Sequence, residues 1–296
     1  MFSNLFGAYL IEKGIITAKQ YNSIKAEQAK TRVKLGFIAV AEKMMTQEQA
    51  DSVNEKQLVM DRRFGDIAIE MGFLNKAQVK NLLTLQGNPY IQFTQSATDL
   101  GILTIEQIED WVLTFQKEKG FTNMDVDAIK SGDIDRIIPL YLPEELPWNT
   151  AELIAVFLRT LTRLVSSDIL IGEAYITDNY EAGAYALQSI NGDLSASTAI
   201  SGSREGLLAI AGGFAKTEFD SIGEESLDSL GEFVNIGDGL YATAISHDMI
   251  EVSLTPPVMS DKGAKLLADK MCIMPIEVSG NAADFVFAID SNINIE

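Results

Sequence analysis

An acid, a second acid, an amide and a glycine follow one another at helical spacing in the last quarter of the chain. They are Asp228, Glu232, Asn235 and Gly239, and the steps between them are four, three and four residues. At about 100° per residue these positions fall within an arc of about 60°, so they share one helix face. An amide donates and accepts hydrogen bonds, whereas a carboxylate accepts them and carries negative charge. The stripe is therefore either a polar contact site for a partner or an ordinary solvated face.

The helix that carries the stripe is predicted to run from about Ser226 to His247, with a broad apolar side. The apolar positions lie at least about 100° from Asp228, and they are Leu227, Leu230, Phe233, Val234, Leu240, Tyr241 and Ala244. Gly237 and Gly239 each lower helix propensity by about 1 kcal/mol relative to alanine. We therefore expect another backbone to approach these two glycines closely.

The elements around this helix indicate an α+β domain over residues 151–296. Helices are predicted at 151–168 and 203–216, and strands at 169–176, 250–255, 271–278 and 284–290. A hairpin is expected over 184–201, with Asn191 and Gly192 in a type I′ turn. Helices separated by antiparallel strands predict one sheet with helices on one face.

Both the stripe and the order of these elements resemble the CheC/CheX/FliY family of phosphatases. The family signature D-x-x-x-E-x-x-N-x-x-x-G is read here at Asp228, Glu232, Asn235 and Gly239. The strand around Glu251–Pro256 and the final pair of strands, with its central Pro275, also resemble CheX, over roughly 145 residues. One copy of the motif is present, as in CheX.

The resemblance implies removal of phosphate from the aspartate of a phosphorylated CheY-like receiver in bacterial chemotaxis or two-component signalling. The receiver would supply its own Mg²⁺ and lysine, so no cofactor or metal of this chain is expected. Asn235 would orient the attacking water, and Glu232 would pair with the receiver lysine. Asp228 and Gly239 would contribute to docking. The family also implies a homodimer.

The first 116 residues form four sequence repeats with a period of 29. Their opening apolar residues are Phe6, Leu35, Phe64 and Phe93, their ninth positions are Gly14, Lys43, Gly72 and Gly101, their twelfth are Thr17, Thr46, Asn75 and Thr104, and their fifteenth are Gln20, Gln49, Gln78 and Gln107. Each unit is predicted to be two short helices, the first stopped at the glycine and the second capped by the Thr or Asn. Such hairpins must stack to bury their apolar faces. The fold prediction is thus a multi-domain chain, with an all-α array over 1–116 and a connector over 117–150.

The sequence pattern of the repeats resembles the MshEN family, the N-terminal domain of type II secretion and type IV pilus ATPases. In that family paired units bind cyclic di-GMP through an opening arginine, apolar positions and a closing glutamine. The third unit fits this pattern best, with Arg63, Phe64, Gly65, Gly72 and Gln86. Elsewhere the arginine position holds Leu5, Lys34 and Gln92, which weakens phosphate recognition. Nucleotide binding and a structural or protein-docking module are both open.

Composition excludes several function classes. A formal net charge of −19 disfavours binding of nucleic acid polymers, which requires clustered basic surface. Because His247 is the only histidine, triads and histidine-based zinc sites have little support. Cys272, the only cysteine, is expected to be a buried thiol. With no long uncharged apolar run and no signal-peptide pattern, we expect a cytoplasmic protein without membrane insertion.

Three functions remain from the sequence. The first is a receiver phosphatase, in which the repeats act as a targeting or sensing module. In the second, the protein is a non-enzymatic adaptor in which both domains only dock partners. The third is a cyclic di-GMP effector that acts through the repeats.

Overall fold

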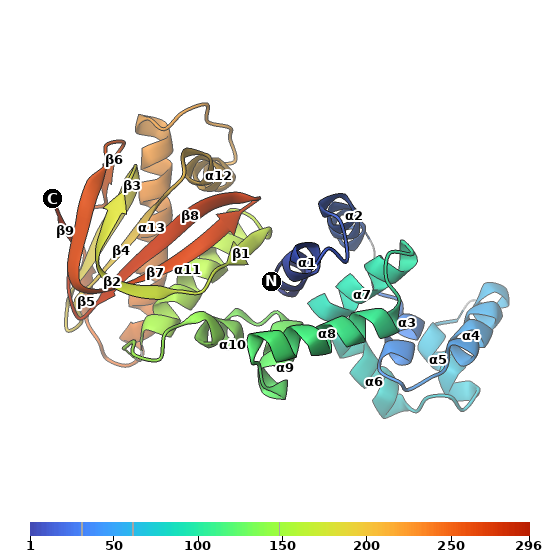
Figure 1. Ribbon diagram of the computed structural model, residues 1–296. Helices are drawn as coiled ribbons and strands as arrows, with labels where there is room; N and C mark the ends of the chain where they lie inside the picture. The colour runs from blue at the N-terminus through green and yellow to red at the C-terminus, as the bar shows by residue number, and fades with distance from the viewer. Residues whose placement is uncertain (31, 61, 148) are drawn as a thin grey trace. The chain divides into compact units, whose positions relative to one another are not determined.

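The chain divides into two compact units, Phe2–Gly132 and Asp133–Glu296, the second grouped with Met1. The computed structural model describes residues 1–30, 32–60, 62–147 and 149–296 (Figure 1). The division falls at Gly132, within the segment predicted as a connector. Residues on its N-terminal side form a helix of the first unit, and residues on its C-terminal side form short helices of the second.

The described residues of the N-terminal unit form nine α-helices. They are α1 (Phe2–Glu12), α2 (Ala18–Gln28), α3 (Leu35–Ala41), α4 (Gln47–Val59), α5 (Phe64–Glu70), α6 (Lys76–Leu85), α7 (Pro89–Asp99), α8 (Ile105–Lys119) and α9 (Asn123–Ser131). Helix α9 lies within the segment 117–150 that is predicted as a connector.

The expected helix stops and caps are present in all four predicted units. The ninth positions Gly14, Lys43, Gly72 and Gly101 have positive φ values of 70°, 55°, 72° and 64°. Each twelfth-position Thr or Asn accepts the backbone N–H of the fifteenth-position glutamine, whose side chain accepts from the cap in return. The recurring glutamine is therefore the second half of a capping box. The four-unit array as an architecture stays a prediction.

An aromatic cluster forms part of the core of this unit. Phe6 lies centrally, with its ring centroid 5.8 Å from that of Phe93 and 5.9 Å from that of Phe115. Helix α9 extends the cluster, because the Lys130 ammonium lies 4.4 Å from the Tyr90 ring centroid. Burial lowers the pKa of Lys130.

The C-terminal unit begins with short helices and continues as three longer helices and a sheet. The helices are α10 (Ile134–Ile137), the 3₁₀ helix η1 (Ile138–Tyr141), α11 (Thr150–Leu164), α12 (Arg204–Ala215) and α13 (Glu224–Ser246). The strands are β1 (Ile169–Ile171), β2 (Tyr175–Ala182), β3 (Tyr185–Gly192), β4 (Ala196–Gly202), β5 (Val252–Leu254), β6 (Val258–Ser260), β7 (Ala264–Val278), β8 (Asn281–Ile289) and β9 (Asn294–Ile295).

These strands of the described chain make one antiparallel sheet in the order β1-β7-β8-β4-β3-β5. β2 and β9 also pair with β7, and β6 pairs with β3. The α+β prediction for this unit agrees with this mixture of helices and antiparallel sheet. In detail, the predicted strand at 169–176 is divided between β1 and β2, and β7 begins seven residues earlier than expected, at Ala264.

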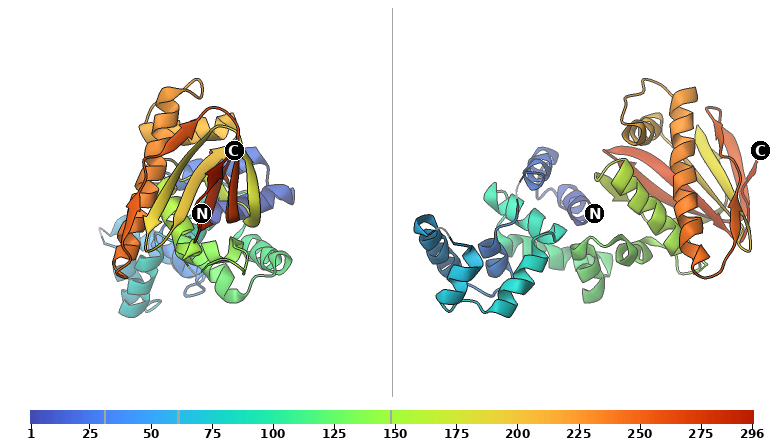
Figure 2. Two further views of the ribbon diagram at one scale, coloured as in Figure 1. Left: turned by 90° about the vertical axis from the view of Figure 1, so that its left-hand side faces the viewer. Right: turned by 180° about the vertical axis from the view of Figure 1, so that it is seen from behind.

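Helices α11, α12 and α13 lie on one face of the sheet (Figures 1 and 2). Their core contains Phe157 of α11, Phe233 of α13 and Phe285 of β8, with ring centroids 5.6 to 6.1 Å apart. Burial of such rings is a major source of stability. A second apolar cluster, which includes Leu187, Met271 and Val286, is formed by β2, β3, β4, β7 and β8 with Ile293.

The predicted β3–β4 hairpin is confirmed, but its predicted turn is wrong. Asn191 and Gly192 belong to β3 and pair with β5, and the loop that follows runs from residue 193 to residue 195. Gly192 has φ 146°, and a side chain there would collide with the backbone of Glu251 and Val252. The glycine therefore permits close approach of β5 rather than a type I′ turn.

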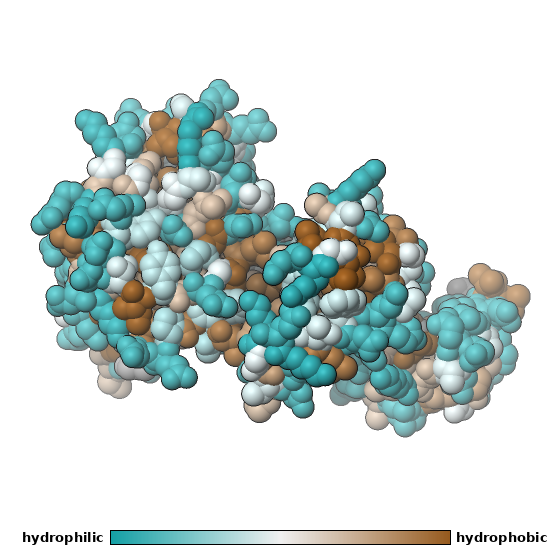
Figure 3. All heavy atoms as spheres, viewed as in Figure 1, coloured by the Kyte–Doolittle hydropathy of each residue, from teal (hydrophilic) through white to brown (hydrophobic). Residues whose placement is uncertain are grey.

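Hydrophilic side chains predominate on the face of the C-terminal unit seen in Figure 3. Among the residues that the structure describes, no helix has both the length and the apolar character needed to cross a bilayer.

Candidate functional site

Helix α13 divides into a buried side and an accessible side. On the buried side Leu230, Phe233, Val234 and Tyr241 are completely shielded from solvent. On the other side Asp228 and Glu232 are exposed, and Asn235 and Gly239 are half-buried. The predicted apolar face is confirmed at these four residues, whereas Leu227 and Ala244 are half-buried and Leu240 is 38% exposed.

The two glycines of this helix differ in their surroundings. A Cβ atom at Gly237 would lie 2.5 to 2.8 Å from ring atoms of Phe157, so the core itself requires a glycine there. At Gly239 no heavy atom of the described residues lies within 4 Å of the corresponding position, apart from the adjacent backbone of the helix itself. The expected approach of another backbone is thus wrong at both glycines: the Phe157 side chain contacts Gly237, and the described part of the chain provides no close neighbour at Gly239.

The side chain of Asn235 is hydrogen bonded by a glutamine of the sheet that the sequence analysis missed. The Nε2 group of Gln188, on β3, donates to Oδ1 of Asn235 at 2.8 Å and to the backbone oxygen of Thr255 at 2.7 Å. Gln188 is 1% exposed. Gln188 shares one face of β3 with Ala186 and Ile190, which lie two residues before and after it and are both buried. This spacing was the available signal that the Gln188 amide points into the protein.

Asp238 is a second buried polar residue under α13 that the sequence analysis missed. It is completely shielded, and both its carboxylate oxygens accept from the Thr198 hydroxyl of β4, at 2.9 and 2.8 Å. Burial raises the pKa of Asp238 to about 8, and the Thr198 hydrogen bond opposes this only in part. An acid about 80° from Asp228, outside the arc of the stripe, was the available signal for it.

Glu232 and Asp228 present free carboxylates. Neither has a hydrogen bond or ion pair with the part of the chain that the structure describes. With the Asn235 amide and the open position at Gly239, they form an accessible polar surface that could receive a cationic group. His247 ends the helix as its C-terminal cap residue and is exposed.

The third repeat unit contributes to a separate pocket within the N-terminal unit. The pocket has a volume of about 1360 Å³, and it brings together the openings of the second and third units, Lys34-Leu35-Gly36 and Arg63-Phe64-Gly65. Gln86 also lines it, whereas Gly72 lies outside it and ends α5. Arg63 and Lys34 are both exposed.

Part of the sequence pattern that resembles the MshEN repeats has a structural explanation. A Cβ at Gly36 would lie 2.9 Å from the Phe64 ring, and one at Gly65 would lie 2.7 Å from Val79. Gln86 accepts from Arg32 at 3.0 Å and donates to the backbone oxygen of Val33 at 2.9 Å. The glycines and the glutamine therefore pack and link the units, while Arg63 has no such role.

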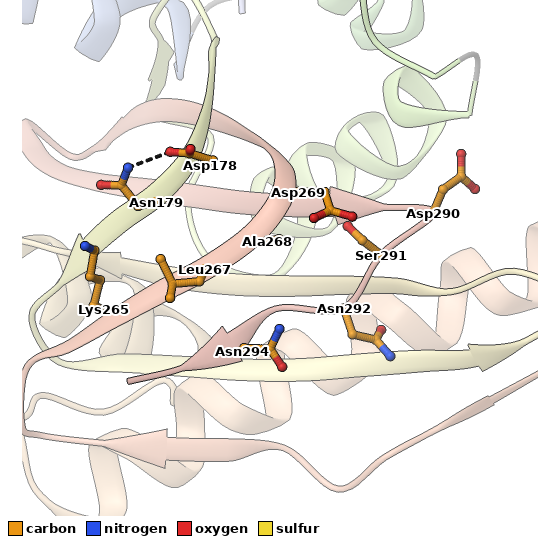
Figure 4. A pocket seen from close by; sticks show the side chains of 10 residues that line it. All are labelled: Asp178, Asn179, Lys265, Leu267, Ala268, Asp269, Asp290, Ser291, Asn292 and Asn294. Atoms are coloured by element: carbon orange, nitrogen blue, oxygen red, sulfur yellow. Dashed lines mark hydrogen bonds between the residues drawn. The ribbon is translucent and has the colours of Figure 1, made fainter.

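A polar pocket of about 820 Å³ lies between β2, β7 and β9 (Figure 4). Asp178, Asp269 and Asp290 line it together with amide side chains, and Asp178 accepts from Asn179 at 2.6 Å. Across the described residues, no three His, Cys, Asp or Glu side chains gather closely enough to hold a metal ion. Cys272, on β7, is 2% exposed, and burial raises its pKa to about 12, so the buried-thiol prediction is confirmed.

No protein-family model matches the sequence, and no curated protein matches it. Similar solved structures are found for the C-terminal half. That half is similar to CheX and CheC-like chemotaxis proteins. A CheC-like superfamily protein from Shewanella sp. PV-4 shares 18% identity over 49% of this chain and 99% of its own, with a TM-score of 0.44.

Two further structures are similar over nearly the same share of the chain. Chemotaxis protein CheX from Vibrio vulnificus shares 18% identity over 46% of this chain and 95% of its own, with a TM-score of 0.41. A complex of CheX with CheY, BeF₃ and Mg²⁺ from Borrelia burgdorferi shares 19% identity over 46% of this chain and 94% of that chain, with a TM-score of 0.38.

We predict that Gly237→Ala and Gly239→Ala change stability in opposite directions. The first adds a methyl group against Phe157 and should lower the free energy of unfolding by about 1–3 kcal/mol. The second adds a methyl group in open space and should raise it by up to about 1 kcal/mol through helix propensity. Urea denaturation followed by circular dichroism measures both. Equal effects of the two changes would contradict the packing described for Gly237.

We predict that Asp238→Asn alters the pH dependence of stability. Because the folded-state pKa is about 8 and the unfolded value is near 3.8, the folded state holds a proton that the unfolded state releases between these pH values. The free energy of unfolding contributed by Asp238 should then fall as pH rises through that window, by at most about 1.4 kcal/mol per pH unit. The amide introduced by the substitution has no titratable proton, so the variant should gain stability relative to wild type between pH 5 and pH 8.

Denaturant midpoints at pH 5, 6, 7 and 8 test this prediction. Asp228→Asn removes an exposed carboxylate from the same helix and should show no comparable gain. If Asp238→Asn and wild type keep a constant difference across the series, the buried carboxyl is not protonated in the folded state.

Proposed function

We propose that the C-terminal unit dephosphorylates the aspartyl phosphate of a CheY-like receiver domain. The observation that carries the proposal is the accessible stripe on α13. Glu232 and Asn235 share it with Gly239, where a Cβ atom would meet no other part of the described chain within 4 Å. The sequence resemblance of this stripe to the CheC/CheX/FliY signature supports the same reaction. The repeats would serve as a targeting or sensing module.

The reaction requires little chemistry from the catalyst. Water attacks the phosphorus of the acyl phosphate, the bond between phosphorus and the aspartate oxygen breaks, and the aspartate leaves as a carboxylate. Both water protons remain with the phosphate, so the products are the receiver carboxylate and dihydrogen phosphate. The receiver supplies Mg²⁺ and a lysine that neutralise the developing charge. What a partner can add is a water held in line with the phosphorus.

Asn235 is the residue suited to that positioning role. Its amide is neutral, so it approaches the phosphoryl group without charge repulsion, and it is half-buried on a helix packed firmly along its opposite side. Glu232, one turn earlier and exposed, would pair with the receiver lysine and fix the docked register. Asp228 would extend this acidic contact, and the open surface at Gly239 would admit the receiver backbone.

We predict that Asn235→Ala lowers the dephosphorylation rate of the cognate receiver about 10²-fold or more while docking is largely kept. A positioning role is expressed in the transition state rather than in binding, so kcat should fall and KM should change little. Phosphate release from receivers of the same genome, phosphorylated by a small-molecule donor, measures both constants. Glu232→Gln, which removes a charge at constant size, should instead raise KM.

Ser246→Ala is the matched control, because Ser246 is exposed on the same side of α13 and lies outside the stripe. It should leave both constants unchanged. If Asn235→Ala is as active as wild type, the catalytic assignment is wrong and the non-enzymatic adaptor is the better hypothesis. That hypothesis expects receiver binding without phosphate release.

We propose as a second candidate function that the N-terminal unit binds cyclic di-GMP in the pocket around Arg63. The specific observation in its favour is that two unit openings, each with a cation, line one pocket. Arg63 can contact a phosphate with two parallel N–H groups, and Lys34 with a single ammonium. The exposed Leu58 and Leu83 side chains on its wall offer apolar surface for a guanine ring.

We predict that Arg63→Ala weakens cyclic di-GMP binding more than Lys34→Ala does, because a bidentate guanidinium contact is lost. Isothermal titration calorimetry of the full chain measures the affinities. Lys76→Ala, at the start of α6 and outside the pocket lining, serves as the charge-matched control. Absence of heat with wild type at high micromolar ligand would leave the unit as a structural or protein-docking module.

The homodimer implied by the family resemblance stays a prediction. The sheet ends at β1 and β2 on one side and at β5 and β6 on the other, and Tyr175 and Val258 on these strands are 47% and 48% exposed. Open edges of this kind can pair with a second copy.

A further inference from the structure

Gln188 is a buried amide at a strand position where apolar residues are expected. Ala186 and Ile190, two residues before and after it, are both completely shielded, and Gln188 lies between them on the side of β3 that faces α13. A buried polar side chain costs stability unless it is hydrogen bonded. Its Oε1 atom has no partner among the described residues, so stability alone does not account for a glutamine.

The two bonds of its Nε2 group determine how the neighbouring amide is oriented. One bond goes to the backbone oxygen of Thr255, which can only accept, so the nitrogen and not the oxygen of Gln188 must face this way. Thr255 itself is fixed, because its N–H donates to the Ser189 backbone oxygen at 2.9 Å and its hydroxyl accepts from the Ser189 N–H at 3.1 Å.

The same Nε2 group faces Asn235, so Asn235 must present an acceptor to it. That acceptor is Oδ1, at 2.8 Å. The Nδ2 group of Asn235 then lies on the other side of the planar amide, away from Gln188. Thr255, the residue that follows β5, thus determines which atom of Asn235 is available to a ligand. Its carbonyl oxygen orients the Gln188 amide, and the Gln188 amide orients that of Asn235.

We propose that Gln188 is a positioning residue that holds the Asn235 amide with its Nδ2 group available to the docked receiver, so that Asn235 acts as a hydrogen-bond donor. This inference rests on the proposed dephosphorylation and specifies how its central residue works. The attacking water accepts a hydrogen bond from an N–H of Asn235 through one of its lone pairs. The other lone pair of the water is then directed at phosphorus. The water protons remain with the phosphate product, because the neutral amide of Asn235 is not a base and takes no proton.

The test is a double-mutant cycle between Gln188 and Asn235, with kcat and KM measured by phosphate release over a range of cognate-receiver concentrations. Gln188→Met keeps the length of the side chain but cannot donate a hydrogen bond. It should lower kcat about tenfold, with KM unchanged, because a misplaced catalytic group costs rate rather than binding. In an Asn235→Ala background the same change should have no further effect, since Gln188 acts only through Asn235.

Gln188→Asn provides a second variant, because it keeps a buried amide that is one methylene too short to reach Asn235, and the same loss of kcat is expected. Ser189→Ala is the control: it removes the 2.8 Å contact between the Ser189 and Ser197 hydroxyls on the opposite face of β3. It should leave kcat unchanged. Thermal unfolding of every variant shows whether the fold is kept.

The outcomes separate this inference from the proposed function. Wild type that fails to dephosphorylate any receiver of its genome overturns both. An active wild type with equally active Gln188→Met and Gln188→Asn variants overturns the positioning role alone. The positioning role is also overturned if the Gln188 substitutions lower kcat equally in wild type and in the Asn235→Ala variant. Such equal losses indicate a general structural effect.

Discussion

The packing of α13 along its whole length is the constraint on which the rest of the C-terminal unit depends. Gly237 allows the ring of Phe157 to lie directly against the helix backbone, and Phe157 in turn contacts the rings of Phe233 and Phe285. Close-packed interiors of this kind have low compressibility, so the core supports the opposite side of the helix firmly. A stripe that must hold a water molecule in place needs such support, since small displacements of a positioning group are costly.

The interface between α13 and the sheet is nonetheless not purely apolar. Two polar pairs cross it, Asn235 with Gln188 and Asp238 with Thr198, and the strand partners Gln188 and Thr198 are directly opposite each other in the β3–β4 register. A well-packed hydrophobic pair is often as stable as a buried polar pair. The Asn235 pair ends at the accessible stripe, whereas the Asp238 pair is wholly enclosed. The first therefore has access to a partner, whereas the second is expected to act on the pH dependence of stability.

Sequence periodicity was sufficient for the helix faces but not for the contacts behind them. The spacing of Asp228, Glu232 and Asn235 determines which side of a helix they share, because that depends only on residues close in the chain. Gln188 and Asn235 are 47 residues apart, and their meeting depends on how β3 registers with its neighbours, which no local pattern contains. The same limit explains the turn at Gly192: the local Asn-Gly pair favours a tight turn, but the approach of β5 determines its backbone conformation.

In the N-terminal unit, the residues that define the repeat are largely those that fold it. The ninth-position glycines end helices, the Thr or Asn and Gln of each unit cap the next helix, and Gly36 and Gly65 make room for Phe64 and Val79. A family resemblance that depends on these folding residues is therefore evidence for a shared local structure. It is weaker evidence for a shared ligand. Evidence for a ligand has to come from residues that folding leaves unexplained. Arg63 meets that condition, because it begins α5 without a side-chain capping bond and remains exposed at the wall of a pocket.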